Sequence, residues 1–313
     1  MLILIFFRTG KMMEYIFILL AVMCFSAQFA FTKLYEGRIG QSTTGTLVML
    51  TGSSLVGALI FFTVKGFQIS YSPISLIWAV VFAVIMLPYY LIGIKVLSLG
   101  SLAIYSMFMM LGGMLVPFFY GIIFLNEAVT VGKILGTVFL TLFIVLQAVW
   151  QGNSEEKQSD KRKRRLFFIL CIVIFFINGM TGVVAKAHAE SAGAVDESSF
   201  TVICCLLTSA LSLLAMLISF LRGTKDKLPI IRKTLELKPI IIMLFLGGAA
   251  YGGNFLLLLA ADKVPASIQF PLVSGGVIVL SALVSAFIFK EKLTKKEWIS
   301  VAGAFASTVL FAF

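Results

Sequence analysis

Charged residues divide this chain into long uncharged segments, and the length of those segments restricts the folds that it can adopt. Crossing the roughly 30 Å hydrocarbon core of a bilayer takes about 20 apolar residues in a helix. Lipid offers no partner for an unpaired backbone group, so such segments form helices, whereas strands of a membrane barrel are alternating stretches of only about 10 residues. The uncharged segments that approach or exceed the helical length are 15–32, 39–64, 66–94, 96–126, 134–154, 166–185, 198–221, 239–261, 264–289 and 298–313.

The composition agrees with a chain embedded in a membrane. Hydrophobic residues make up 60% of it, charged residues make up 12%, and its mean hydropathy is +1.06. A soluble domain normally carries about a quarter charged residues. The net charge of +11 does not indicate nucleic acid, because the basic residues lie between the apolar segments, as in "SEEKQSDKRKRR" at 154–165. We therefore predict an all-α integral membrane protein with ten transmembrane helices, in contact with lipids and not with nucleic acid.

Two parts of the sequence are similar to each other, which indicates an internal duplication. Residues 101–133 align with residues 265–297, and "FSAQFAFTK" (25–33) matches "NGMTGVVAK" (178–186). Each half then holds five helices, and this odd number requires the second copy to enter the membrane upside down, as in the inverted repeats of secondary transporters. The predicted division is an N-terminal extension at 1–12, a first five-helix repeat at 13–150, a charged linker at 151–165 and a second five-helix repeat at 166–313.

The fourth and ninth predicted helices are equivalent in this alignment, and both contain residues that weaken a helix. Paired interruptions point to a substrate site, because irregular backbone persists at membrane depth only beside protein or a watery cavity. Close packing of helices through small residues is the alternative reading of the glycines. Glu127 and Glu291, which follow the two helices, are predicted to fix a hinge. The predicted helix breaks are Gly112, Gly113 and Pro117 in the fourth helix, and Pro271, Gly275 and Gly276 in the ninth.

The order and spacing of these features resemble the drug/metabolite transporter superfamily, in its ten-helix EamA-like branch. The resemblance rests on the ten spans, the duplication, the hinges "FLNEAVTVGKILG" and "IFKEKLTKKEWISVAG", and the stretch "AADKVPASIQFPL" before the ninth helix. It covers almost the whole chain from Met13. The sequence departs from the family at Phe25 and Asn178, where members often carry tryptophan, and at Ser300, where the first copy has Gly136. The resemblance implies a central cavity lined by helices one, three, four, six, eight and nine.

Neutral polar side chains inside those helices are the candidates for substrate contact. Aromatic hydroxyls and amides offer hydrogen bonds and apolar faces together, which suits a small polar or amphipathic solute. Lys33 and Lys186, which are equivalent across the duplication, either reach an anionic group of the substrate or extend to lipid headgroups. The predicted substrate-binding residues are Gln28, Tyr90, Tyr105, Asn178, Thr181, Asn254 and Gln269.

These features favour a secondary transporter that moves a small polar or amphipathic metabolite, or a drug, across the cell membrane by alternating access. A flippase for a lipid carrier or phospholipid would use the same fold with a lateral opening. An enzyme would need a reactive cluster at membrane depth, and the sequence has one histidine and no acidic residue clearly inside a span. The four cysteines fall in apolar segments without metal-ligand spacing, so we predict neither a metal site nor a cofactor. A monomer or a homodimer is expected.

The lysines and arginines also predict an orientation. Most of the 25 basic residues fall on the side of the membrane that holds the loop 154–165. Cytoplasmic loops carry the excess of Lys and Arg, so this distribution places that loop inside the cell and both termini outside. Members of the resembled family mostly have both termini in the cytoplasm, which is the opposite expectation.

Overall fold

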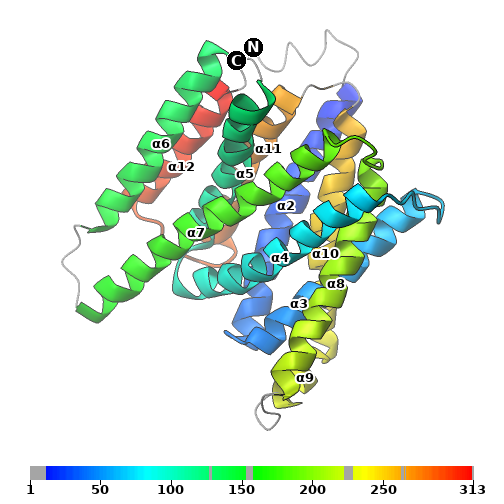
Figure 1. The fold of residues 1–313 in the computed structure, drawn as a ribbon. Coiled ribbons are helices and arrows are strands. Elements are labelled where there is room, and N and C mark those ends of the chain that lie inside the picture. The colour runs from blue at the N-terminus through cyan, green and yellow to red at the C-terminus, as the bar shows by residue number, and fades with distance from the viewer. Residues whose placement is uncertain are drawn as a thin grey trace.

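The structure is a computed structural model of the chain, and it describes residues 12–126, 129–152, 158–221, 228–261, 264 and 266–311 (Figure 1). Every regular element in these ranges is a helix. The helices are α2 (Met12–Ile39), α3 (Thr43–Val64), α4 (Pro73–Leu99), α5 (Leu102–Leu125), α6 (Val131–Gly152), α7 (Gln158–Ala189), α8 (Glu197–Leu221), α9 (Leu228–Thr234), α10 (Leu237–Ala261), α11 (Ala266–Phe287) and α12 (Lys295–Phe311).

Eight helices within the described residues are long and apolar enough to cross a membrane. They are α2, α3, α4, α5, α7, α8, α10 and α11, and they support the prediction of a multi-pass helical membrane protein. Of the other two predicted spans, α6 has a shorter apolar helical part at Val131–Phe143, and α12 has 17 residues. The short α9, with 7 residues, was not predicted.

Three helices begin directly after a serine that lies within one of the uncharged segments. Ser42, Ser72 and Ser101 precede α3, α4 and α5, and each side-chain oxygen accepts a hydrogen bond from a backbone N–H in the first turn. The predicted span 66–94 was placed too early, because residues 65–72 form a connection and α4 begins only at Pro73. Within the predicted linker 151–165, residues 158–165 are helical and continue directly into the apolar part of α7.

The helices pack mainly against helices from the other half of the chain. The most extensive contacts join α2 to α10 and α11, α7 to α4 and α5, α3 to α8 and α10, and α4 to α8. α5 crosses α11, and α6 packs beside α12 at one edge of the bundle (Figure 1). The largest buried cluster includes Leu102, Met107 and Leu111 of α5, Ile174 of α7 and Val277 of α11. The start of α2 and the end of α12 lie at the same end of the bundle (Figure 1).

The predicted helix breaks are not interruptions in the structure. α5 continues through Pro117, and α11 continues through Pro271; the residues on both sides of each proline are helical. The glycines instead permit close packing, because a Cβ at Gly112 would lie 2.1 Å from the backbone oxygen of Phe175 on α7. At Gly275 it would lie 2.3 Å from Thr308 Oγ1 on α12. At Gly276 a Cβ would lie 2.9 Å from Val22 Cγ2 on α2. Small residues therefore set how closely these helices approach.

Candidate functional site

Four tyrosines of α4, α5 and α10 gather in the interior of the bundle. The rings of Tyr89 and Tyr90 have centroids 5.2 Å apart, and Tyr105 lies near both. Tyr251 lies near Tyr90. The predicted residues Tyr90 and Tyr105 are 7% and 3% exposed. We call Tyr89, Tyr90, Tyr105 and Tyr251 the tyrosine cluster; Tyr89 and Tyr251 were not among the predicted substrate-binding residues.

Small polar residues of α3 and α8 border the tyrosine cluster. Tyr90 lies beside Ser53, and Tyr251 lies beside Cys205 and Ser54. The Ser54 hydroxyl oxygen is buried without a hydrogen bond of normal geometry to any described residue. Every side chain named here is uncharged at neutral pH.

Two glycines make room for the tyrosine rings, and sequence reasoning missed both. A Cβ at Gly57 of α3 would lie 2.5 Å from ring atoms of Tyr251. A Cβ at Gly93 of α4 would lie 2.7 Å from the hydroxyl oxygen of Tyr105. Because contacts under about 3 Å force a shift, the absence of a side chain at these positions fixes where the two tyrosines lie. A single glycine within a span carries no sequence signal for this role.

Two predicted amides tie helices together. Asn178 of α7 donates from Nδ2 to the backbone oxygen of Met109 on α5, at 2.6 Å. Gln269 of α11 donates from Nε2 to the backbone oxygen of Leu257 on α10, also at 2.6 Å, and it is 4% exposed. Each amide thus satisfies a donor across a helix interface, where an unpaired buried amide would cost a few kcal/mol. The geometry gives both amides a packing role.

The other predicted polar residues are scattered. Thr181 donates to the backbone oxygen of Asn178 in its own helix, at 2.6 Å, and Asn254 donates to that of Ala250, at 2.8 Å. Gly247, two turns earlier on the same face of α10, packs against α3. Asn254 is exposed, so α3 does not cover the helix at this position. Gln28 is half-buried on α2, and the structure gives its side-chain amide no hydrogen bond within the described residues.

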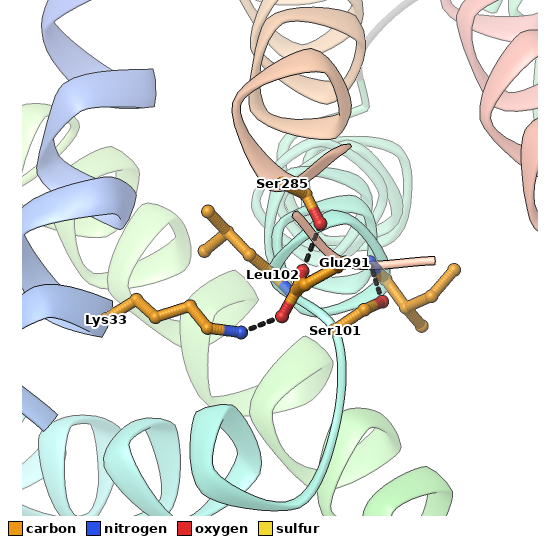
Figure 2. Close-up of polar contacts among 6 residues, drawn as sticks. Lys33, Ser101, Leu102, Ser285 and Glu291 are labelled. Atoms are coloured by element: carbon orange, nitrogen blue, oxygen red, sulfur yellow. Dashed lines mark hydrogen bonds and ion pairs between the residues drawn. The ribbon is translucent and has the colours of Figure 1, made fainter. Parts of the chain in front are cut away.

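Lys33 of α2 and Glu291, which follows α11, form an ion pair across the bundle (Figure 2). Glu291 also accepts a hydrogen bond from the hydroxyl of Ser285, and one of 3.0 Å from the backbone N–H of Leu102, the first residue of α5. A carboxylate is favoured there because the first N–H groups of a helix lack internal partners and the helix dipole attracts anions. We call Lys33, Glu291, Ser285 and the Leu102 N–H the Glu291 cluster.

The turn that ends α11 positions the Glu291 carboxylate. Lys290 adopts the left-handed conformation, with φ of 54°, and the N–H of Glu291 returns to the backbone oxygen of Ser285 at 3.1 Å. Left-handed residues of this kind commonly end helices. Lys33 is held from a second side, since its Nζ lies 5.5 Å from the ring centroid of Phe289. Sequence reasoning gave Lys33 and Glu291 separate roles, as a charge contact and a hinge, and the structure brings them together.

The second predicted charge contact lies near the opposite end of α5. Lys186 of α7 has its Nζ 3.5 Å from the backbone oxygen of Pro117. Glu127, the predicted counterpart of Glu291, lies outside the described residues. Another carboxylate was missed entirely: Glu14, in the first turn of α2, is 5% exposed. The sequence offered no signal for its burial because it stands at the boundary of its apolar segment.

A polar network closes the end of the bundle where α4 and α8 begin. Asp196 accepts hydrogen bonds from the backbone N–H and the hydroxyl of Ser199, at 3.1 and 2.7 Å, and pairs with Lys65 at 3.2 Å. His188 is 3% exposed, lies stacked 3.6 Å from the Phe200 ring, and hydrogen-bonds through Nε2 to Ser75 Oγ at 2.9 Å. Within the described residues, no group of three or more His, Cys, Asp or Glu side chains could hold a metal ion.

The stability of this network is expected to depend on pH through Asp196. Burial raises the pKa of Asp196, but the hydrogen bonds from Ser199 and the pairing with Lys65 outweigh it, so the net pKa lies below its ordinary value. Its stabilisation is therefore present above about pH 4, the ordinary aspartate pKa, and is lost as the pH falls through the lower folded value. In detergent, the melting temperature of the native protein should fall toward that of Asp196→Asn between about pH 6 and pH 3. A gap that stays constant over this range would contradict the prediction.

Comparison with known proteins adds information on the fold. No protein-family model matches the sequence, and no curated protein matches it. Among solved structures 26 chains match, and one of them is described only as "Crystal structure of protein". It has a TM-score of 0.57 and 15% sequence identity to this protein, over 93% of this chain and 95% of its own. At this identity the similarity shows a shared fold alone. Fold and site together define a multi-pass helical membrane protein with an uncharged polar cluster in its interior.

Proposed function

We propose that the protein is a secondary transporter that moves a small polar or amphipathic metabolite across the cell membrane by alternating access. The proposal includes ten membrane-spanning helices arranged as two inverted five-helix repeats, similar to the ten-helix EamA-like branch of the drug/metabolite transporter superfamily. It rests on how the helices pair and on the chemistry of the tyrosine cluster.

The pairing of the helices carries the proposal. The five helices α2 to α6 can be exchanged one by one with α7, α8, α10, α11 and α12. Under this exchange the contact of α2 with α10 becomes that of α7 with α4, and the contact of α5 with α7 becomes that of α11 with α2. The pair α3 and α10 becomes α8 and α4, while the pairs α3 and α8, α5 and α11, and α6 and α12 map onto themselves. A bundle of unrelated helices has no reason to repeat its contacts in this way.

This symmetry supports a mechanism. Two repeats of five spans each must have opposite directions in the membrane, and inverted repeats place a solute site near the midplane, where rocking of the halves exposes it to each side in turn. The tyrosine cluster fits such a site because its residues come from both halves: Tyr89, Tyr90 and Tyr105 from the first, and Tyr251 from the second. A solute held there would contact both halves at once.

The chemistry of the site supports the substrate class. Hydroxyl groups beside aromatic faces bind a solute that has hydrogen-bonding groups and apolar surface together. No charged side chain belongs to the tyrosine cluster or to Ser53, Ser54 and Cys205 beside it. A solute that carried a net charge would therefore lose its hydration without a compensating partner. The proposed substrates are uncharged small molecules.

Transport in proteoliposomes, with a panel of labelled metabolites, tests the proposal. For a solute that is taken up, Tyr90→Phe and Tyr251→Phe should each raise the half-saturation concentration about 3- to 10-fold, the change for one lost hydrogen bond of about 1 kcal/mol. Tyr71→Phe is the matched control, since this tyrosine is 67% exposed and lies in a connection between helices. Equal effects of all three changes, or saturation unchanged by the first two, would exclude the tyrosine cluster as the substrate site.

A further inference from the structure

The Glu291 cluster joins three helices at one end of the bundle. Lys33 belongs to α2 and Leu102 to α5, both in the first half of the chain, whereas Ser285 and Glu291 belong to α11 and its closing turn (Figure 2). One carboxylate thus serves as the shared acceptor for all three. No apolar contact could combine them in this way, because only a charged acceptor attracts both an ammonium group and a helix N-terminus.

A second polar contact joins α5 and α11 one helical turn further from this end of the bundle. Ser106 is four residues after Leu102 on α5, and Ser281 is four residues before Ser285 on α11. Their hydroxyl oxygens are 2.5 Å apart, and both residues are 0% exposed. α5 and α11 are therefore held together at two successive levels of this end. The serine pair lies one helical turn further into the bundle than Leu102 and Ser285, which both contact Glu291.

The energetic character of the cluster suits a contact that forms and breaks. The side chains of Lys33 and Glu291 are 15% and 18% exposed, so neither charged group is fully enclosed by the protein. Separation would lose the attraction between the charges but would return their hydration, and these two large terms nearly cancel for ion pairs. A small net difference between closed and open states is what a gate requires, since a minor state must remain populated.

We propose that the Glu291 cluster is the gate that closes this end of the transporter, and that it opens when α2 and α5 separate from α11. This inference rests on the proposed alternating access. It assigns to Lys33 a role in switching between states in place of contact with the substrate. It also predicts that Glu291 acts on the access of water to the interior, at a distance from the tyrosine cluster.

A cysteine reporter measures this opening without any transport assay. The four native cysteines are replaced by serine, and Ser106→Cys is introduced as the reporter; a small, charged, water-soluble thiol reagent is then applied to purified protein. In Glu291→Gln and in Lys33→Met, the reaction at position 106 should be at least about tenfold faster than with the intact cluster, which corresponds to about 1.4 kcal/mol in the equilibrium between closed and open states. Lys33→Arg keeps the charge and should react slowly, like the intact protein.

Two controls separate gating from loosening of the whole structure. Ser212→Cys reports from the interface of α3 and α8, where Ser212 is 0% exposed and its oxygen lies 2.6 Å from Thr51 Oγ1. It should stay unreactive in every variant. Asp196→Asn breaks the ion pair at the opposite end and should not speed the reaction at position 106. Unchanged reactivity at 106 in both cluster variants would overturn the proposal, and so would equal gains at 106 and 212.

The result of this thiol-labelling experiment can be told apart from the result of the transport assay. The reporter reads the access of water and needs no substrate, so a selective gain at position 106 would support the gate even if no tested metabolite were transported. Conversely, transport that depends on the tyrosine cluster, together with unchanged reactivity at 106, would preserve the transporter and reject this gate.

Discussion

Gly112→Ala is expected to be among the most destabilising single methyl additions in this protein. The new Cβ would lie 2.1 Å from the backbone oxygen of Phe175, and the carbonyl carbon and Cα of the same residue would be 2.7 and 2.8 Å away. A backbone cannot rotate aside as a side chain can, so α5 and α7 must separate along their crossing. Overpacking typically lowers the free energy of unfolding by about 1–3 kcal/mol. The separation would also weaken the hydrogen bond from Asn178 to the backbone oxygen of Met109.

The measurement is thermal unfolding in detergent, with the fraction of monodisperse protein as a second readout. Gly248→Ala is the matched control, because a Cβ there would meet nothing within 4 Å although the residue also lies inside a helix. Alanine at that position should leave the melting temperature unchanged or raise it, since alanine favours a helix over glycine by about 0.5–1 kcal/mol. If Gly112→Ala melted like Gly248→Ala, the close approach of α5 and α7 would be wrong.

The helical membrane fold was predictable because it follows from local properties of the chain. Each long apolar segment has to satisfy its backbone within itself, and a helix does so regardless of its neighbours. The last helix begins at Lys295, earlier than the uncharged segment 298–313 indicated. Thr294 and Glu297 exchange hydrogen bonds across its first turn, which is the capping pattern of a Thr-x-x-Glu sequence. The absence of charge after Lys65 could not reveal the connection 65–72, since a turn can be as free of charge as a span.

The long-range contacts of the site were not predictable from the same information. Lys33 and Glu291 are 258 residues apart, and their meeting depends on how α2 crosses α11. The sequence singled out Tyr90 and Tyr105 as polar groups in spans, but it could not show that Gly57 and Gly93 create the space for the neighbouring rings. Gln269 was predicted to contact a substrate, and in the structure its amide donates to a backbone oxygen, a partner that no side-chain pattern records.

Exchanging the two charges of the Glu291 cluster is expected to restore stability only in part. Lys33→Glu alone places two carboxylates together, and Glu291→Lys alone places two ammonium groups together. Each single change removes one partner of a largely buried ion pair, which typically costs about 3–5 kcal/mol. The double variant, with Lys33→Glu and Glu291→Lys, regains the attraction between positions 33 and 291. If this attraction were the only effect, the double variant would unfold at the same temperature as the native protein.

The double variant should nevertheless melt below the native protein, because Glu291 does more than carry a charge. Its carboxylate accepts hydrogen bonds from the N–H of Leu102 and the hydroxyl of Ser285, and a lysine has no acceptor to offer either group. A lysine would also place a cation at the positive end of the α5 dipole. Losing a helix cap costs about 0.5–2 kcal/mol, so the double variant should fall between the native protein and the two single variants in thermal unfolding. Full recovery would mean that Glu291 acts through charge alone and that the start of α5 does not depend on it.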